Sequence, residues 1–307
     1  MSILALAAGC DKAKQSKDAD APPPPSFDVA TKPPLVFQAF GSLDSTRLVP
    51  IAAIINGTPT AITLPDADWK RLDSLYFQKG TSYPVYRDGR PVGTVTVTRR
   101  MWEPDSEPLY SLPGCRSVRP MAGVDLKTTV ALDPAFEFLS LSTPRTAPSA
   151  APTGPADLVQ SVRALATTVL KSEQLDSTDI DTASFSARAM HVGGAKVTLV
   201  ASQVDANAGD AGPGAGHTTH FLIFGDDPDG KGYQVSYRHL ESGEARTVEF
   251  QRLLDHLDMN GDGTDEALIE SWRYAGTNEL VLLQRNNGKW HESLRVPQNW
   301  CVRQKPK

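Results

Sequence analysis

The alternation of apolar and polar positions in the first half of the chain predicts two β-hairpins. Each consists of two runs rich in Val, Ile, Thr and Tyr around a two-residue turn of the Asn-Gly or Asp-Gly type, which suits the twist of a hairpin. The predicted hairpins are Val49–Ile55 with Thr58–Thr63 around Asn56-Gly57, and Tyr83–Arg87 with Arg90–Thr98 around Asp88-Gly89. Residues 121–141 are expected to add one or two strands to the same β-rich domain.

Two segments instead repeat their apolar residues at helical spacing. Pro65-Asp66 opens a short helix in which Trp69, Leu72 and Tyr76 fall on one face. A longer amphipathic helix is predicted at 156–173, and its apolar face consists of Leu158, Val162, Leu165, Val169 and Leu170.

After this second helix the pattern returns to short strands separated by polar turns. We expect turns at Asp229-Gly230, Ser242-Gly243 and Asn287-Gly288, and a loop tip at Ala206–Gly216. The predicted strands are Lys196–Gln203, His220–Phe224, Tyr233–Leu240, Arg246–Leu253, Ala267–Tyr274, Glu279–Gln284 and Lys289–Leu294. The pattern predicts a fold that is mainly β, with antiparallel sheets and a few short helices.

Proline-rich segments separate the predicted domains. The charged and proline-rich stretch 10–34 cannot bury enough apolar surface to order itself, so it is predicted to be a disordered tether. A second Pro/Ala-rich segment, 143–155, has the composition of a linker. The expected order is therefore a tether, an N-terminal β-rich domain at 35–142, the linker, a helix plus β domain at 156–302, and a tail at 303–307.

Charge and hydropathy narrow the classes of partner. The formal net charge of -5 gives no basic field, so no nucleic acid partner is expected. The chain also contains no apolar stretch approaching the roughly 18–20 residues that a membrane-spanning helix needs.

The first ten residues end in Leu6-Ala7-Ala8-Gly9-Cys10, which resembles the lipobox of bacterial lipoproteins. The resemblance implies that residues 1–9 are a signal peptide remnant and that the thiol of Cys10 carries a lipid. It further implies a lipid-anchored protein of the bacterial cell envelope, facing the periplasm or lying on the outer surface. For such a protein we expect another envelope protein or a glycan as the partner. The alternative is a frayed N-terminus with a free cysteine, because no Lys or Arg precedes the apolar run.

Two cysteines remain, Cys115 in a turn-rich context and Cys301 near the C-terminus. In an oxidising compartment a disulfide between them would remove chain entropy worth roughly 4–5 kcal/mol from the unfolded state. Two separate buried thiols are the alternative, and the sequence leaves both interpretations open.

One loop has the residue spacing of a calcium site. Calcium binds 6–8 hard oxygen ligands, which alternate acidic or amide side chains in a tight loop can supply. An EF-hand would need its closing Glu at position 12 of the loop, where Ile269 stands, and helices instead of the strand-like flanks seen here. The expected ligands are the side chains of Asp258, Asn260, Asp262 and Glu266 and the backbone carbonyl of Thr264, with Gly263 allowing the sharp turn.

This loop and the strand–turn–strand pattern after it resemble FG-GAP (VCBS-like, integrin α-chain-like) repeats over residues 246–295. The resemblance implies a structural calcium ion and a sheet or sandwich in the C-terminal domain. A full propeller needs several repeats, and only one good loop is present, so a propeller is not expected.

Other candidate sites are weaker. The two imidazoles of His217-Thr218-Thr219-His220 could bind zinc, with His239 or His256 as a third ligand. However, residues three apart on a strand point to opposite faces. No nucleophile elbow, His-Glu-x-x-His motif or phosphate loop is present. The sequence therefore favours a non-catalytic binding or interaction module with a structural calcium ion. An envelope hydrolase with an active site between the two domains is the alternative.

Overall fold

The computed structural model describes residues 27–42, 45–101, 121–145, 154–175, 180, 185–192, 197–204, 217–273 and 278–298. Cys10, Cys115, Cys301 and the loop tip 206–216 lie outside these residues, and so do the predictions that rest on them. None of the helices in the described ranges combines the length and the apolar character needed to cross a membrane.

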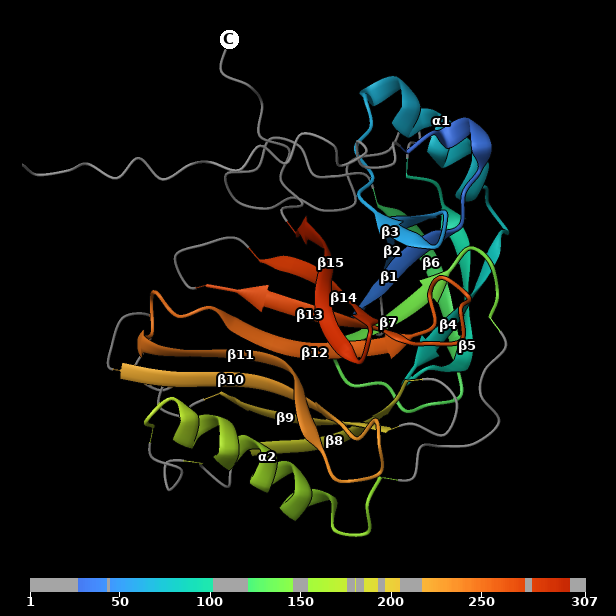
Figure 1. Cartoon of the computed structure of the whole chain (residues 1–307). Coiled ribbons are helices and arrows are strands. Elements are labelled where there is room, and N and C mark those ends of the chain that lie inside the picture. The colour runs from blue at the N-terminus through green and yellow to red at the C-terminus, as the bar shows by residue number, and fades with distance from the viewer. Residues whose placement is uncertain are drawn as a thin grey trace, which may run out of the picture.

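The first half of the described chain forms a closed antiparallel β-barrel (Figure 1). Six strands follow the order β1-β7-β4-β5-β6-β2, and pairing of β1 with β2 closes the sheet. A short strand, β3, extends β2 as a hairpin. The strands are β1 (Leu35–Ser42), β2 (Ser45–Ile55), β3 (Thr58–Thr60), β4 (Ser82–Arg87), β5 (Arg90–Arg99), β6 (Ala122–Thr128) and β7 (Phe136–Leu141).

Side chains of the barrel strands point alternately into the barrel and away from it. Leu35 and Phe37 on β1 point into the barrel core, whereas Val36 between them belongs to a second core outside the barrel. Helix α1 (Asp66–Tyr76) adds Leu72 and Tyr76 to the barrel core. Val29, in the one-turn 3-10 helix η1 (Val29–Thr31), joins the same core, so part of the segment expected to be a tether packs against the barrel.

The second half forms a two-sheet sandwich with one helix on its outside. One sheet has the order β11-β10-β9-β8 and the other is the meander β12-β13-β14-β15, and every pairing is antiparallel. The elements are α2 (Leu158–Ser172), β8 (Phe185–His191), β9 (Val197–Val204), β10 (His217–Asp226), β11 (Gln234–Glu244), β12 (Phe250–Leu257), β13 (Glu266–Trp272), β14 (Glu279–Asn286) and β15 (Lys289–Pro297).

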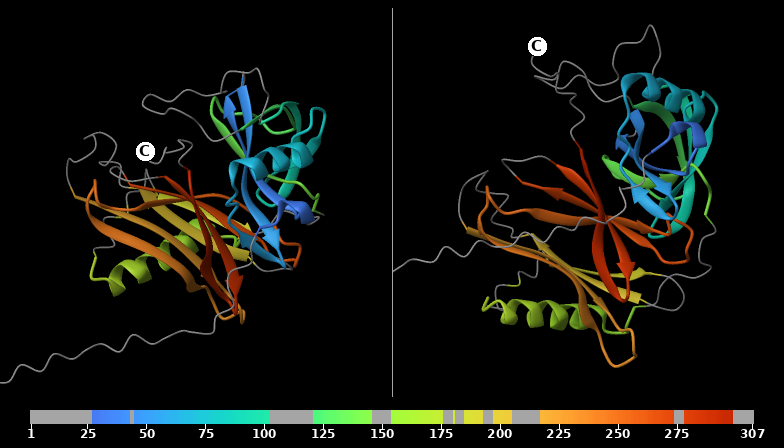
Figure 2. Two further views of the ribbon diagram at one scale, coloured as in Figure 1. Left: turned by 90° about the horizontal axis from the view of Figure 1, so that it is seen from above. Right: turned by 45° about the horizontal axis from the view of Figure 1, so that its top comes forward.

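These elements stack in four layers, namely α2, the β8–β11 sheet, the β12–β15 sheet and the barrel (Figure 2). Helix α2 packs its apolar face on β9 and β10, and the two sheets share a core that contains Phe224 and Trp290. The outer face of the β12–β15 sheet packs against the barrel. This last contact, the junction core, consists of Val36, Ile51, Ala52, Ile54, Tyr86, Leu139 and Leu141 from the barrel and Leu257, Met259, Leu268, Leu280 and Leu282 from the sandwich.

The predicted fold class, mainly β with antiparallel sheets and no propeller, is confirmed for the described residues. Both predicted hairpins and both predicted helices are present. The turns Asn56-Gly57, Asp88-Gly89 and Asn287-Gly288 have positive φ at both positions, as a type I′ hairpin turn requires.

Two expectations about the strands are wrong. Ser242-Gly243 is not a turn, because both residues pair with Thr219 and Thr218 inside β11 and the chain turns only after Glu244. As a consequence, the strand expected from Arg246 begins later, at Phe250. Strand β8 was also not predicted, because its alternation of Ser, Ala and Arg between Phe185 and His191 is only weakly apolar.

Candidate calcium loop and the adjacent cleft

The predicted calcium loop joins two neighbouring strands, β12 and β13, as its sequence indicated. Asp258 holds the turn together, because its Oδ1 and Oδ2 accept hydrogen bonds from the backbone N–H groups of Gly261 (2.6 Å) and Gly263 (3.0 Å). Both glycines have φ near +85°, a conformation that residues with a Cβ rarely adopt. The glycines therefore allow the chain to wrap around the Asp258 carboxylate.

Asn260 and Asp262 fold back onto the same loop. Asn260 Oδ1 accepts from the N–H of Asp262 (2.8 Å), and Asp262 Oδ1 accepts from the N–H of Thr264 (2.8 Å). Asn260 Nδ2 donates to Asp262 Oδ2 at 3.0 Å. Local hydrogen bonds of this kind order short polar side chains in a turn before any ligand binds.

Glu266 lies at the start of β13 and is 2% exposed. Its Oε2 accepts from the N–H of Met259 (2.8 Å), and Gln284 Nε2 donates to its Oε1 (3.3 Å). Burial raises the pKa of Glu266 to about 8, and the charges of Asp262 and Asp258 contribute to the rise. A cation in the loop would relieve this unfavourable burial of a carboxylate.

The donor set fits calcium in kind, since all five predicted ligands offer oxygen. The spacing of the ligands is wider than a bound ion would require. Asp258, Asp262 and Glu266 do not each place a carboxylate oxygen within 4.8 Å of the other two. Among the described residues, the only group of three acidic or histidine side chains this close is a different one, Asp88, Asp255 and His256. Calcium binding would therefore draw the loop oxygens together.

The loop also docks on the barrel. Asn260 Nδ2 donates to the carbonyl of Gly57 in the β2–β3 turn (3.1 Å), and Arg145 Nη2 donates to the carbonyl of Met259 (3.0 Å). The side chain of Met259 is fully buried in the junction core. Any ion that orders this loop therefore also orders the contact between barrel and sandwich.

A second barrel turn docks on the strand that leads into the loop. The N–H of Asp88 donates to Asp255 Oδ1 (2.8 Å), and the N–H of Gly89 donates to the carbonyl of His256 (3.0 Å). Burial raises the pKa of Asp255 to about 6. The sequence did not indicate this cluster, because Asp88 was recognised only as a turn residue and its partners follow it by 167 or more positions.

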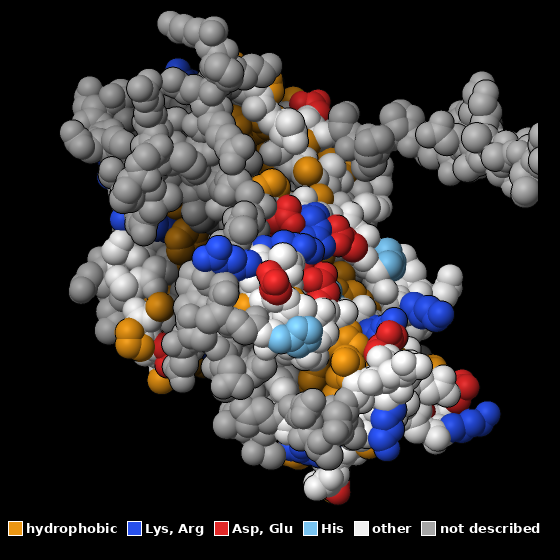
Figure 3. Space-filling model, turned by 90° about the vertical axis from the view of Figure 1, so that its left-hand side faces the viewer, with side chains coloured by type: hydrophobic (Ala, Val, Ile, Leu, Met, Phe, Trp, Pro, Cys, Tyr) orange, Lys and Arg blue, Asp and Glu red, His pale blue; other side chains and the backbone are white. Residues whose placement is uncertain are grey.

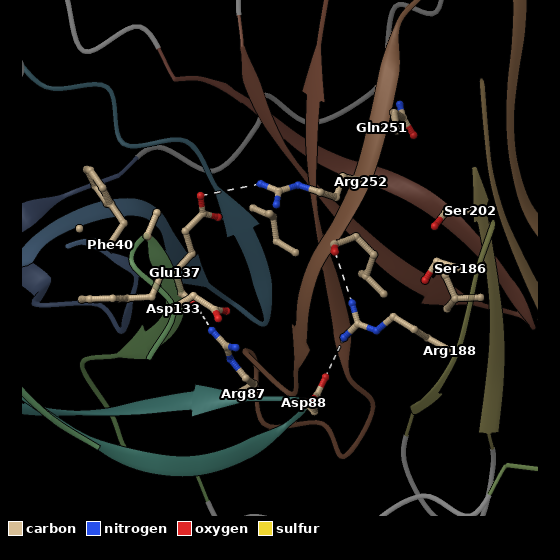
Figure 4. A pocket seen from close by; sticks show the side chains of 16 residues that line it. Phe40, Arg87, Asp88, Asp133, Glu137, Ser186, Arg188, Ser202, Gln251 and Arg252 are labelled. Atoms are coloured by element: carbon tan, nitrogen blue, oxygen red, sulfur yellow. Dashed lines mark hydrogen bonds and ion pairs between the residues drawn. The ribbon is translucent and has the colours of Figure 1, made fainter. Parts of the chain in front are cut away.

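Between the barrel and the sandwich lies a cleft of about 850 Å³ (Figure 4). Arg188 of β8 pairs with Asp88 across it (2.8 Å), and Arg252 of β12 lies 3.8 Å from Glu137 of β7. Burial raises the pKa of Glu137, although the charge of Arg252 opposes the rise. The cleft therefore presents charged groups of both signs on walls that belong to different halves of the chain.

The two histidines of the His217-Thr218-Thr219-His220 segment lie on opposite faces of β10. His220 is fully buried, and its Nε2 accepts from the N–H of Gln251 (2.7 Å). His217 is exposed and forms a hydrogen bond with Ser242 Oγ (2.9 Å). The two imidazoles therefore do not form a joint site with each other, as the strand geometry predicted.

The molecular face in Figure 3 mixes basic and acidic side chains, and no large field of one sign covers its described part. Ion pairs of the sandwich include Arg273–Glu249 (2.5 Å) and Arg295–Glu279 (2.7 Å), and the two charges of each pair neutralise one another locally.

Comparison with protein-family models, with curated proteins and with solved structures finds no match for this chain. The likenesses to a lipobox and to an FG-GAP repeat therefore rest on the residues of these two motifs alone.

Proposed function

We propose that this chain is a bacterial envelope lipoprotein whose folded part is a non-catalytic binding module. In this proposal Cys10 carries the lipid anchor, a calcium ion in loop 258–266 has a structural role, and the ligand binds between the barrel and the sandwich. The observation that carries the proposal is the cleft of about 850 Å³ with walls from both halves of the chain.

The lining of the cleft supports a polar ligand. Its volume falls within the ~300–1,000 Å³ that is usual for ligand sites. Arginines and carboxylates lie beside the hydroxyls of Ser186 and Ser202 and the ring of Phe40. Alternating donors and acceptors with an aromatic ring suit a glycan or a peptide better than a lipid or a polyanion.

The proposed calcium loop lies at the junction of the barrel and the sandwich, so it can help to hold the two walls of the cleft in place. It contacts the barrel through Asn260 and Met259, so a bound ion would stiffen one edge of the junction beside the cleft. The role of calcium is then to hold two parts of the chain in register, and the ion itself touches no ligand.

Binding can be tested with soluble envelope glycan fragments and with short peptides as separate probes, by calorimetry. The proposal expects one class of probe to bind the wild type and to bind Arg188→Gln at least tenfold more weakly. Arg188 and Asp88 are both exposed, so breaking their pair costs little stability. Lys171→Gln on the outer helix α2 is the matched control and should bind as the wild type does. Equal binding by all three proteins would exclude the cleft as the site.

A hydrolase is the second candidate, and one observation favours it. Asp88, Asp133 and Glu137 all line the cleft, and burial raises the pKa of Glu137, which is the direction that suits a general acid. Turnover of a bound glycan by the wild type, lost in Glu137→Gln while binding persists, would establish the hydrolase. Binding without turnover supports the binding module.

The anchor is tested independently by mass spectrometry of the protein from its native membrane. A lipid-modified Cys10 at the mature N-terminus is expected. An unmodified N-terminus would remove the lipoprotein proposal and leave the cleft unaffected.

A further inference from the structure

Three side chains with metal-binding chemistry meet where the β4–β5 turn touches the sandwich. Asp88 stands at the tip of that turn, and Asp255 and His256 are neighbours on β12. One ligand atom from each lies within 4.8 Å of the others. The register of β12 shifts between Leu253 and Asp255, so the irregularity lies directly before the two residues of the cluster that belong to this strand.

His256 has the environment of a preorganised ligand. The residue is 1% exposed, and its Nδ1 lies 2.6 Å from Asp265 Oδ2. Its Nε2 has no hydrogen-bond partner among the residues that the structure describes. Metal-bound histidines commonly use one ring nitrogen for the ion and hold the other against a carboxylate. The pair His256–Asp265 provides that arrangement.

Each of the two carboxylates, Asp255 and Asp88, uses one oxygen in hydrogen bonds to described residues and leaves the other without one. Asp255 is 5% exposed, and its Oδ1 accepts the N–H groups of Asp88 and His256, both at 2.8 Å. Asp88 Oδ1 accepts from Arg188 Nη2 at 2.8 Å. In both residues Oδ2 makes no hydrogen bond to a described residue, so each has one oxygen for an ion.

A small cavity that Asp255 lines, without Asp88 or His256, contains two further buried acceptors. Gln38 lines it, is 4% exposed, and has an Oε1 without a hydrogen-bond partner in the described structure. Glu137 lines the same cavity, and its buried Oε2 is also unpartnered there. Buried acceptors without donors are costly, and a cation or a water bound to a cation would satisfy them.

We propose that Asp88, Asp255 and His256 form a second metal site, for a first-row transition ion such as Zn²⁺ or Mn²⁺. One imidazole nitrogen with two carboxylates suits such an ion, whereas calcium prefers oxygen ligands alone. Three protein ligands leave at least one coordination position for water or for a ligand. Because Asp88 also lines the cleft, the ion would lie at the wall of the cleft. This site is separate from the calcium loop and does not depend on the proposed function.

The test is titration of the calcium-saturated protein with Zn²⁺, followed by calorimetry and by elemental analysis after gel filtration. The wild type is expected to retain one Zn²⁺ more than Asp88→Asn, or to bind it at least tenfold more tightly. This variant removes a carboxylate oxygen but keeps an Asn-Gly turn, which is equally suited to the hairpin. His217→Gln, which removes an exposed histidine on β10, should bind Zn²⁺ as the wild type does.

Two further variants separate the outcomes. His256→Gln should also lose the ion. If the protein with this buried substitution does not fold, the result for Asp88→Asn alone decides whether the site exists. Asp262→Asn, in the calcium loop, should keep its Zn²⁺. Zn²⁺ binding that is unchanged in Asp88→Asn would overturn the proposal, and so would binding that disappears in His217→Gln. Failure of calcium binding would leave this result intact.

Discussion

Nδ1 of His256 lies 2.6 Å from Oδ2 of Asp265, and both residues are buried at the base of loop 258–266. His256 is the next-to-last residue of strand β12, and Asp265 immediately precedes β13. The pair therefore joins the two ends of the loop from below. Because the ends are fixed by protein contacts, an ion bound in this loop would only have to draw the loop tip together, and less conformational entropy would be lost on binding.

Calcium is expected to stabilise the folded protein. A ligand that binds only the folded state adds about 2.7 kcal/mol at a hundredfold excess over its Kd. Thermal unfolding in calcium and in chelator should therefore differ clearly for the wild type and much less for Asp262→Asn. Asp229→Asn, an exposed acidic residue near another turn, is the matched control and should keep the full difference. No difference in the wild type would defeat the calcium proposal.

Alanine at Gly89 should weaken the docking of barrel on sandwich. A Cβ there would approach Asp265 Oδ2 to 2.9 Å and His256 Cε1 to 3.4 Å. Gly288→Ala is the control, because Gly288 has a similar positive φ in the same kind of turn but no atom within 4 Å of the added Cβ. Both variants bear the backbone strain, and only Gly89→Ala bears the crowding, which we expect to cost about 1–3 kcal/mol more. Denaturant unfolding measures the difference, and equal losses would contradict the docking.

His220 should make the protein sensitive to acid. Burial lowers its pKa to about 4, from a usual value of 6.5. Between these values the unfolded state binds a proton that the folded state does not, so stability falls as the pH drops from 6.5 toward 4. His220→Gln keeps an acceptor for the N–H of Gln251 but cannot titrate, and should lose up to about 3 kcal/mol less over this interval. The check is the free energy of unfolding against pH, with His217→Gln as the control. Parallel curves for His220→Gln and the wild type would contradict the expectation.

Met259→Ala should destabilise the barrel and the sandwich together. The side chain is fully buried in the junction core, which both halves share. Truncation of a buried Met costs roughly 2–5 kcal/mol. Val159→Ala, at an apolar position of α2 that is 52% exposed, should cost far less. A single shifted transition in circular dichroism and in tryptophan fluorescence is expected. Two separate transitions, with only one of them shifted, would show that the halves unfold independently.

The sequence predicted the features whose cause is local. Asn56-Gly57, Asp88-Gly89 and Asn287-Gly288 take positive φ because of their own residue types, so each hairpin could be recognised from a few residues. The two helices followed from apolar spacing in the same way. The loop at 258–266 was also found where expected, between two strands.

The features that depend on distant segments could not be predicted. Closure of the barrel requires β1 to pair with both β2 and β7, and β7 begins about a hundred residues later. Ser242-Gly243 has the composition of a turn but continues as a strand because β10 supplies pairing partners. The cluster of Asp88, Asp255 and His256 forms only after the barrel has docked, and no spacing within one segment indicates it.

Because two turns of the barrel dock on the sandwich, they should not tolerate inserted residues. The β2–β3 turn contacts Asn260 through Gly57, and the β4–β5 turn contacts His256 through Gly89, so an insertion in either would push the two halves apart. A Cβ at Gly230, between β10 and β11, or at Gly288, between β14 and β15, would have no atom within 4 Å. Peptide tags or extra residues should therefore be accommodated at those two outer turns and rejected at the two inner ones.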